Sequence, residues 1–386
     1  METPTSTIIR RFELVTETYP PEINGVALTV QSLHDGLKAL GHDVGLVRPA
    51  RPGESADESM ELLRVEGAPI PRYPGMRFGL PSGRKLAARW MRQRPDAIYI
   101  ATEGPLGWSA LRAAKRLGIP VATGFHTRFD DYVGRYGAGF LSPWVFAWLR
   151  RFHNRADATL VPTRELAEQL TAQGFQHACR LGRAVDTVRF NPQFRSEALR
   201  ERWGLKPDDL AVVHVGRLAP EKNLPLLMRC FEALKAERPG SRLVLVGDGP
   251  ARAALSDQHP EVIFAGTLRG DALAAHFASA DLFCFPSLSE TFGNVTLEAM
   301  ASGIATVAFD YGAAREHLRD GEHGASLPFG DEAAFLARFL EVARSPRLGA
   351  MGAAARVAVE GLSPERVSRD FADLLTGLAH PMKRAA

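Results

Sequence analysis

The sequence predicts an α/β fold made of two doubly wound halves, each with a parallel sheet and helices around it. Short apolar, β-rich runs alternate with longer amphipathic stretches along the chain, which is the pattern of parallel strands joined by helices. The 386 residues are too many for one hydrophobic core and suit two domains of roughly 190 residues. A hydrophobic fraction of 45% and a charged fraction of 24% exclude collagen, fibrous coils and disordered chains.

The first half contains five apolar runs that we expect to be strands, at residues 12–16, 43–47, 97–100, 121–123 and 158–162. Three helical patterns follow these runs, at residues 25–39, 106–117 and 164–173. Thr163 has a side chain that is favoured at a helix N-cap and marks the start of the third helix.

The second half repeats the scheme. Its expected strands are residues 211–215, 242–246, 262–265, 282–286 and 306–309. Its expected helices are residues 224–237, 250–258, 271–278 and 295–301, followed by an Ala-rich helical region over 331–360.

The domain boundary is expected in the irregular stretch AVDTVRFNPQFRS, which contains a proline and precedes the second set of strands. We therefore predict an N-terminal domain over 1–195 and a C-terminal domain over 196–362. Ser363 and Pro364 are suited to the N-cap and first position of a final helix, in residues 363–386.

Several classes of protein are excluded. Cys179, Cys230 and Cys284 stand far apart without a CxxC pair or a histidine cluster, which argues against a disulfide framework or a zinc site. No uncharged apolar run approaches 18 residues and no secretory signal is recognisable, so we expect a cytoplasmic protein. The net charge of +3 is unremarkable and no nucleic-acid partner is expected.

Positive charge is concentrated in the first half. Up to Phe190 there are 25 Lys and Arg against 19 Asp and Glu. Seven basic residues lie between Arg72 and Arg94 without one carboxylate, which suggests an acidic partner.

In open α/β sheets ligands bind beyond the carboxyl ends of strands. After the first strand, a Pro-Pro loop leads to Asn24 and Gly25 at a helix start, where backbone N–H groups attract anions. A plain capped turn is the alternative for this loop. His126 follows another strand of the first half, in TGFHTRFDDY, where a structural role is the alternative.

The loop VGRLAPEKNL of the second half places Arg217 and Lys222 at the head of a helix. Two cations beside the positive end of a helix dipole favour an anion, so we predict a phosphate site, against the alternative of a solvated loop. Gly247 and Gly249 invite comparison with a dinucleotide fingerprint, but its third glycine would fall at Arg252. A Walker-type loop is absent, as is a DxD pair for a divalent metal, so no metal is expected.

The densest group of polar residues is FCFPSLSETFGNVTLEAMASG, in which a strand, a polar loop and a helix follow one another. Glu290 precedes the helix and Glu298 lies about one turn inside it, so both carboxylates can face a ligand above the helix start. The intervening segment supplies further donors to phosphate oxygens. The predicted donor-side residues of this segment are Glu290, Thr291, Phe292, Gly293, Asn294 and Glu298. Capping by Glu290 and a surface position for Glu298 are the alternative.

With these residues assembled, the chain resembles the retaining glycosyltransferases of glycosyltransferase family 4, whose GT-B architecture has two facing Rossmann-like domains. PPEINGV, GRLAPEKN and SETFGNVTLEAMASG are similar to its acceptor-side loop, its donor-phosphate loop and its E-x7-E element. The resemblance also implies that the C-terminal helix crosses back to the first domain.

The resemblance also implies roles for single residues. Arg217 and Lys222 would hold the diphosphate of a nucleotide-sugar donor and Glu298 its ribose, without a metal or cofactor. Glu290 would contact sugar hydroxyls, and His126 would contact the transferred sugar from the other domain. FHTRF, ADATLVPT and FDYGAAREH look most like bacterial hexosyltransferases that act on lipid acceptors.

The sequence therefore predicts a metal-independent hexosyltransferase that acts on a lipid or glycolipid. A non-catalytic nucleotide-sugar-binding subunit and a nucleotide-sugar epimerase of the same architecture are the alternatives. The segment FLSPWVFAWLRRF combines Trp144, Phe146 and Trp148 with Arg150 and Arg151, which is typical of a segment at a membrane surface. We expect reversible association with anionic lipid, on the inner face of the cell membrane; a helix packed on its own core is the alternative.

Overall fold

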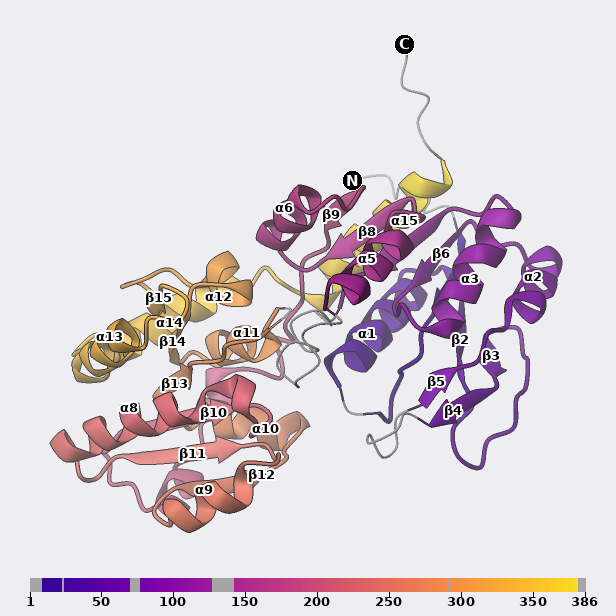
Figure 1. The fold of residues 1–386 in the computed structure, drawn as a ribbon. Coiled ribbons are helices and arrows are strands. Elements are labelled where there is room, and N and C mark those ends of the chain that lie inside the picture. Colours follow the sequence, from indigo (N-terminus) through magenta and orange to yellow (C-terminus); the bar gives the residue numbers. More distant parts are fainter. Residues whose placement is uncertain (1–8, 23, 70–76, 127–141, 291, 381–386) are drawn as a thin grey trace, which may run out of the picture. The chain divides into compact units, whose positions relative to one another are not determined.

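The structure, a computed structural model, describes residues 9–22, 24–69, 77–126, 142–290 and 292–380. It has two compact units, one formed by Met1–Gly182 with Pro364–Ala386 and the other by Arg183–Ser363. Each unit contains a parallel sheet with helices packed on it (Figure 1). The α/β class and the two similar sheets agree with the prediction.

The first unit has a seven-stranded parallel sheet in the order β3-β2-β1-β6-β7-β8-β9. Its strands are β1 (Arg11–Val15), β2 (Asp43–Pro49), β3 (Leu62–Val65), β6 (Ala97–Ile100), β7 (Val121–Gly124), β8 (Ala158–Val161) and β9 (Ala178–Arg180). β4 (Gly67–Pro69) and β5 (Arg77–Gly79) form a separate antiparallel pair. The five predicted strands correspond to β1, β2, β6, β7 and β8.

Helices pack on both faces of this sheet. They are α1 (Gly25–Ala39), α2 (Gly83–Arg92), α3 (Pro105–Arg116), α5 (Ser142–His153), α6 (Arg164–Ala172) and the C-terminal α15 (Pro364–Ala379). One core cluster joins β1, β2 and β6 to α1 and α15, and another joins β1 and β6 to α2 and α3. The sheet is therefore covered on both sides, as expected for parallel strands.

The C-terminal helix completes the core of the first unit. Phe371 on α15 is fully buried and meets the ring of Tyr99 edge-on, with a centroid separation of 5.1 Å. A Cβ at Gly36 of α1 would lie only 1.9 Å from Ser368 Oγ, so glycine allows the two helices to approach closely. α15 thus belongs to the first unit although unit 2 precedes it in the chain.

The second unit has a six-stranded sheet in the order β12-β11-β10-β13-β14-β15. Its strands are β10 (Ala211–Val215), β11 (Arg242–Val246), β12 (Ile263–Gly266), β13 (Leu282–Phe285), β14 (Ala305–Phe309) and β15 (Gly324–Leu327). Counted from β10, the order is 3-2-1-4-5-6, which is that of a Rossmann fold. All five predicted strands are present, and β15 is an additional one.

The helices of the second unit surround this sheet. They are α7 (Glu197–Arg202), α8 (Leu224–Glu237), α9 (Arg252–Gln258), α10 (Gly270–Ala278), α11 (Asn294–Ala301), α12 (Gly312–His317), α13 (Glu332–Arg344) and α14 (Leu348–Val359). Short 3₁₀ turns lie at η3 (Pro192–Phe194) and η4 (Pro220–Lys222). The predicted helical region 331–360 is divided into α13 and α14.

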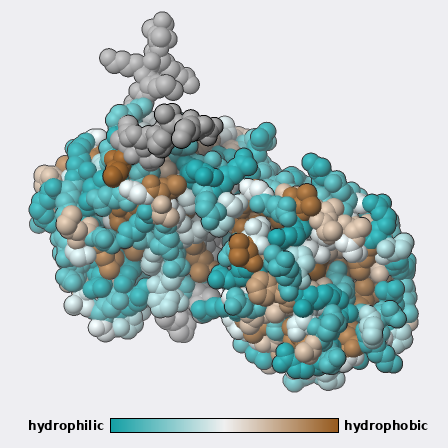
Figure 2. Space-filling model, turned by 180° about the vertical axis from the view of Figure 1, so that it is seen from behind, coloured by the Kyte–Doolittle hydropathy of each residue, from teal (hydrophilic) through white to brown (hydrophobic). Residues whose placement is uncertain are grey.

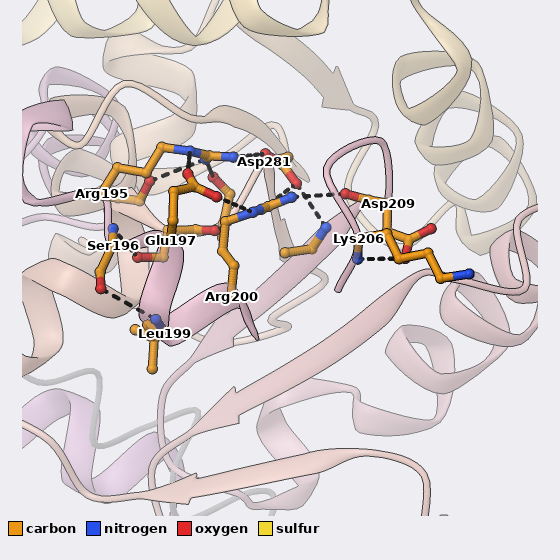
Figure 3. A network of polar contacts seen from close by, with 12 residues as sticks. Arg195, Ser196, Glu197, Leu199, Arg200, Lys206, Asp209 and Asp281 are labelled. Carbon is orange, nitrogen blue, oxygen red and sulfur yellow. Dashed lines mark hydrogen bonds and ion pairs between the residues drawn. The ribbon is translucent and has the colours of Figure 1, made fainter. Parts of the chain in front are cut away.

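The stretch predicted to end the first domain at 195 instead begins the second unit, whose first residue is Arg183. Phe190 is buried against Phe277 of α10, with ring centroids 5.9 Å apart. Arg195 donates to Asp281 at 3.1 Å in the polar network of Figure 3. These contacts join residues that are far apart in the sequence. The composition of the stretch alone therefore misplaced the boundary between the two domains.

The same network fixes the start of β10. The buried Arg200 donates to one carboxylate oxygen of Asp281 at 2.9 Å and to the carbonyl of Asp209 at 2.8 Å (Figure 3). That Asp281 oxygen also accepts the Ala211 N–H at 2.8 Å. In such a charged pair, the mutual attraction and the additional hydrogen bonds offset much of the free energy that desolvation costs.

The visible surface is mainly hydrophilic. On the face in Figure 2, hydrophobic residues lie singly or in small groups among hydrophilic ones. Such scattered apolar residues are normal for a folded protein. Trp144 and Trp148 on α5 are large exceptions, with 77% and 42% of their surface exposed.

We predict that Phe371→Ala lowers the free energy of unfolding of the first unit by about 3–5 kcal/mol, because it removes a buried aromatic ring and leaves a cavity. Urea denaturation followed by tryptophan fluorescence measures this, since Trp90, Trp108, Trp144 and Trp148 report on that unit. Arg369→Ala, at an exposed position of the same helix, is the control and should change the midpoint little. Equal effects of the two substitutions would contradict a core role for α15.

Candidate functional site

The candidate site of the second unit lies where its strand order reverses. β10 and β13 are neighbours in the sheet. The strands that follow β10 in the chain lie on one side of this pair, and the strands that follow β13 lie on the other side. Such a switch point leaves a crevice beyond the carboxyl ends of the two strands, and ligands of doubly wound sheets bind there. The loop with Arg217 and Lys222 follows β10, and the loop with Glu290 follows β13.

The loop after β10 turns tightly before α8. Residues Pro220–Lys222 form η4, and Asn223 then has left-handed backbone angles of φ 50° and ψ 47°. Asn223 Nδ2 donates to Glu332 Oε1 at 2.9 Å, which ties the turn to α13. This geometry places Lys222 immediately before the first turn of α8.

Lys222 and Glu290 form an ion pair between the two loops. Only 12% of the Lys222 side chain and 18% of the Glu290 side chain are exposed. Ser287 Oγ donates to Glu290 Oε1 at 2.9 Å, and Tyr311 Oη donates to the Ser287 carbonyl at 2.9 Å. The ammonium of Lys222 also lies 5.5 Å from the ring centroid of Phe285, a favourable cation–π arrangement.

Ser287, at the start of the loop after β13, acts on Glu290. It is fully buried and its hydroxyl contacts Glu290 rather than facing solvent as a phosphate donor. Ser287 orients the Glu290 carboxylate toward Lys222. No local sequence signal distinguishes this serine from Ser289 two residues later.

Arg217 is more exposed than Lys222. Nearly half of its side chain, 47%, is accessible, and its Nη1 lies 3.7 Å from Glu221 Oε1. At this distance and exposure the pair with Glu221 is weak. The structure thus brings Lys222 and Glu290 together and places Arg217 on the same loop.

Gly247 and Gly249 pack closely against the loop that follows β10. A Cβ at Gly247 would lie 1.9 Å from the Gly216 carbonyl oxygen, and one at Gly249 would lie 2.4 Å from that of Leu218. The Leu218 N–H donates to the Asp248 carbonyl at 2.9 Å. Close packing between two loops therefore explains the two glycines. This agrees with the sequence, which lacks the third glycine of a dinucleotide fingerprint.

The start of α11, after the loop that follows β13, is the other part of the candidate site. Gly293 has φ 93° at the N-cap, no side chain caps the helix, and its first turn contains no acid. Uncapped N–H groups at a helix start attract anions. Phe292 is buried, and its carbonyl accepts the Ala313 N–H at 2.7 Å. Thr291 lies outside the described residues.

Glu298 lies about one turn inside α11 and is half-buried. Burial raises the pKa of its carboxyl group to about 7. Among the described residues its carboxyl group has no hydrogen-bonding partner that would offset this desolvation. Such a group can accept hydrogen bonds from a polar ligand.

His214 is a site residue that sequence reasoning missed. It lies on β10, fully buried, and its Nδ1 is 3.0 Å from the Cys284 carbonyl, which requires a proton on Nδ1. Nε2 is buried without a partner. A Cβ at Gly216 would lie 3.7 Å from both this nitrogen and Lys222 Cε, so the imidazole underlies the phosphate loop. The only signal is a polar residue inside the apolar run AVVHV.

The residues expected on the first unit follow β1 and β7. Asn24 caps α1, with Oδ1 accepting the Ala27 N–H at 2.8 Å and Nδ2 donating to Thr18 Oγ1 at 2.7 Å. A side chain at Gly25 would meet nothing within 4 Å. His126 Nε2 lies 2.6 Å from Tyr99 Oη. The capped-turn alternative thus describes Asn24 well, and it does not preclude a ligand above Gly25.

Glu17 is a second residue that sequence reasoning missed. Its carboxylate accepts the Leu106 N–H at 3.0 Å at the start of α3, where Gly104 offers no side-chain cap. Burial is the main cause that raises the pKa of Glu17 to about 7, and the nearby Glu103 contributes. Glu17 and Glu103 follow β1 and β6, the strands at the switch point of this sheet.

The acid-free stretch Arg72 to Arg94 is not one exposed basic surface. Arg89 is buried and pairs with Glu13 at 2.9 Å. Arg92 pairs with Glu58 at 2.7 Å, and Arg94 donates to the carbonyl of Leu117 at 2.9 Å. Arg89, Arg92 and Arg94 therefore have partners from distant parts of the chain, whereas Arg72 lies outside the described residues.

The described residues contain no group of three or more His, Cys, Asp or Glu side chains placed to hold a metal ion. None of the described helices combines the length and the apolar character needed to span a membrane.

The sequence matches two family models. Residues 23–189 match Glycosyltransferase Family 4, and residues 209–345 match Glycosyl transferases group 1. A GDP-mannose-dependent alpha-mannosyltransferase of Mycolicibacterium smegmatis is 37% identical over 313 residues, or 79% of this chain and 81% of that protein. An alpha-monoglucosyldiacylglycerol synthase of Streptococcus pneumoniae is 27% identical over 77% of this chain and 70% of that protein.

Solved structures of the GT-B fold are similar in architecture. Sucrose-phosphate synthase from Thermosynechococcus elongatus has a TM-score of 0.74 at 18% identity, covering 96% of this chain and 99% of that one. Anabaena HepE in complex with UDP and glucose has a TM-score of 0.72 at 18% identity, covering 95% and 100%. At these identities the likeness shows the fold.

We predict that His214 makes the second unit less stable as the pH falls from about 6.5 to about 4. Burial lowers the pKa of His214 to about 4, whereas an exposed histidine titrates near 6.5. In this window the unfolded chain binds a proton that the folded chain does not, which costs at most about 1.4 kcal/mol per pH unit. Urea denaturation followed by circular dichroism should show a flatter pH dependence in His214→Gln. Parallel pH profiles would contradict a neutral, buried imidazole.

Proposed function

Because the chain belongs to glycosyltransferase family 4 and is a hexosyltransferase, we propose that its second unit binds the nucleotide diphosphate hexose and that transfer retains the anomeric configuration. The observation that carries this proposal is the Lys222–Glu290 pair at the switch point, beside the uncapped start of α11. A cation and free N–H groups converge there on the position that a diphosphate needs.

The chemistry follows from charge. Breaking the sugar–phosphate bond leaves negative charge on the departing nucleotide diphosphate. Lys222, Arg217 and the N–H groups of α11 stabilise that charge as it develops, and preorganised donors of this kind are worth about 3 kcal/mol each. On this proposal the reaction needs no metal or cofactor.

Donor binding exchanges the partner of Lys222. The diphosphate takes the place of the Glu290 carboxylate beside the ammonium, and Glu290 becomes available to the sugar hydroxyls. Glu298 accepts hydrogen bonds from the ribose, and its carboxylate is the form that accepts two. Asn294, Phe292 and Gly293 supply backbone contacts at the helix start. His126 is the residue that we propose for recognition of the transferred sugar.

We propose GDP-mannose as the donor and a lipid or glycolipid as the acceptor. Support comes from relatives: GDP-mannose-dependent alpha-mannosyltransferases reach 37% identity, and alpha-monoglucosyldiacylglycerol synthases are more distant members of the same group. The loop with Asn24 and Gly25, at the carboxyl end of β1, is the proposed acceptor side.

The enzyme reaches a lipid acceptor by peripheral association with the inner face of the cell membrane. α5 exposes Trp144 and Trp148, and Arg150 and Arg151 of the same helix are exposed as well. Aromatic rings suit the depth of lipid headgroups, and each cation near an anionic surface contributes about 1 kcal/mol.

One prediction from the proposed function concerns the donor. GDP-mannose is expected to stabilise the protein more than UDP-glucose or UDP-galactose in a thermal-shift assay, by about 2.7 kcal/mol at 100 times its dissociation constant. With a glycolipid acceptor and EDTA present, mannose should be transferred. Binding without transfer or hydrolysis would favour a non-catalytic subunit, an epimerised sugar would favour an epimerase, and a strict Mg²⁺ or Mn²⁺ requirement would contradict metal independence.

The second prediction concerns the phosphate loop. Lys222→Ala and Arg217→Ala are each expected to lower turnover at least tenfold, because each removes a charged donor to the leaving diphosphate. Steady-state kinetics measures this, with circular dichroism as the test of folding. Lys206→Ala, an exposed lysine of the same unit, is the control. Wild-type turnover in both loop variants would remove their proposed role.

The third prediction concerns the membrane. Vesicles with anionic lipid are expected to recover the protein in flotation at low salt, and recovery should fall as salt rises because ions screen the attraction. Trp144→Ala with Trp148→Ala should reduce recovery by removing the aromatic anchors. Equal recovery with neutral and anionic vesicles, or none with either, would argue for a soluble acceptor.

A further inference from the structure

A groove in the first unit is distinct from the donor-side and acceptor-side residues described above. It has a volume of about 600 Å³ and lies between the start of α2 and the exposed side of α3. Its cationic lining comes from Arg84, Lys85, Arg112 and Arg116, with Glu66 as its one carboxylate. The groove therefore concentrates positive charge from two helices.

This charge is poorly compensated within the chain. Among the described residues, Arg84, Arg112 and Arg116 pair with no carboxylate, and Lys85 reaches only the exposed Glu66, at 3.9 Å. By contrast, Arg89 and Arg92 of the same helix α2 have acidic partners. Like charges gathered without counterions repel one another, so the groove gains from a bound anion.

The start of α2 faces the same groove and lacks a cap. Ser82 makes no side-chain capping bond, since its hydroxyl donates to the Leu80 carbonyl at 2.9 Å. The first turn contains no acid and carries Arg84 and Lys85. Cations at this end of a helix oppose its dipole, whereas an anion there accepts the free N–H groups and pairs with the cations.

Trp108 adds a third, independent feature. It lines the groove, and its indole Nε1 is buried without a hydrogen-bonding partner among the residues that the structure describes. Trp108, Arg112 and Arg116 are four residues apart on α3 and so share one face of the helix. The guanidinium of Arg112 lies 5.8 Å from the Trp108 ring centroid. The aromatic ring thus supports one of the groove's cations.

The aromatic side of the groove indicates where the anion comes from. The ring of Trp108 lies 5.8 Å from that of Trp148 on α5, and Trp148 and Trp144 are exposed. The groove thus adjoins the helix that we assign to the membrane surface. A phosphate held at headgroup depth is available there, together with a bilayer for the exposed tryptophans.

We propose that the groove between α2 and α3 binds the phosphate of an anionic lipid headgroup, separately from the donor diphosphate. The phosphate accepts from the first turn of α2 and pairs with Arg84, Arg112 and Arg116. This proposal rests on the proposed membrane association and gives it a specific lipid chemistry. In a lipid without net charge, such as phosphatidylcholine, the headgroup ammonium already compensates the phosphate, so it offers the groove less net countercharge than an anionic lipid does.

The test compares two triple variants that lose the same charge. Arg84→Gln, Arg112→Gln and Arg116→Gln remove the groove's unpaired cations. Arg202→Gln, Lys206→Gln and Arg347→Gln remove exposed cations of the second unit. Binding to phosphatidylcholine vesicles with 0 or about 30% phosphatidylglycerol is measured by flotation at fixed salt. The groove variant should bind the anionic vesicles at least tenfold more weakly than the wild type, and the control variant less than threefold.

Two outcomes of this comparison would overturn the proposal. Equal losses in the two variants would show a diffuse response to net charge, and no loss in the groove variant would show that the groove is not used. Inorganic phosphate at matched ionic strength provides another arm. If it stabilises the wild type but not the groove variant, and displaces the vesicles at micromolar concentration, the site serves a soluble anion and the lipid assignment is wrong.

Donor binding separates this proposal from the proposed function. The groove variant should retain the wild-type thermal shift with GDP-mannose in the absence of vesicles, since none of its three residues belongs to the donor site. Loss of donor binding in the wild type would refute the proposed donor but leave the vesicle comparison interpretable. Trp108→Phe keeps a ring and removes the indole N–H, so it should weaken binding to the anionic vesicles by about threefold. Wild-type binding by this variant would remove the N–H from the proposed site.

Discussion

The ion pair between Lys222 and Glu290 is the interaction on which the candidate site depends. Each partner comes from a different loop, and the two loops follow strands that are neighbours only because the strand order reverses between them. Removing one member of such a largely buried pair leaves a charge without compensation, which costs several kcal/mol. The pair thus links the loop after β10 to the loop after β13. The surrounding residues serve this arrangement: Ser287 orients Glu290, Phe285 supports the ammonium, and Asn223 fixes the turn.

The sheet of each unit has a switch point, but the charged side chains at the two switch points differ. In the second unit a cation meets a carboxylate at the switch point. In the first unit Glu17 and Glu103 follow the corresponding strands, and burial raises the pKa of Glu17 to about 7. The cations of the groove in the first unit lie elsewhere, on α2 and α3. The proposed donor site therefore belongs to the second unit.

The sequence was informative wherever a residue's role depends on its neighbours in the chain. The buried strands and α1 were predicted because periodicity and caps are local, and Lys222 and Glu290 were predicted because both stand in strand-following loops. Arg89 was assigned to an exposed stretch because its partner Glu13 lies 76 residues away. His214 was missed because one polar residue does not interrupt an apolar run. The edge strands β3 and β9 were missed because neither is a continuous apolar run. The boundary at 182 depends on Phe190 and Arg195 finding partners about 86 residues later, which no local pattern reports.

The position of α15 also has a consequence for synthesis on the ribosome. The first unit is interrupted by 181 residues, since unit 2 runs from Arg183 to Ser363 (363 − 183 + 1 = 181). At roughly 5–20 residues per second, translation of this insert takes about 10–35 seconds. During that time the apolar faces of α1 and β6, which Phe371 and Leu375 later cover, have no partner from their own chain. The second unit is contiguous and can fold as soon as it emerges, so the unit translated first is the last to complete its core.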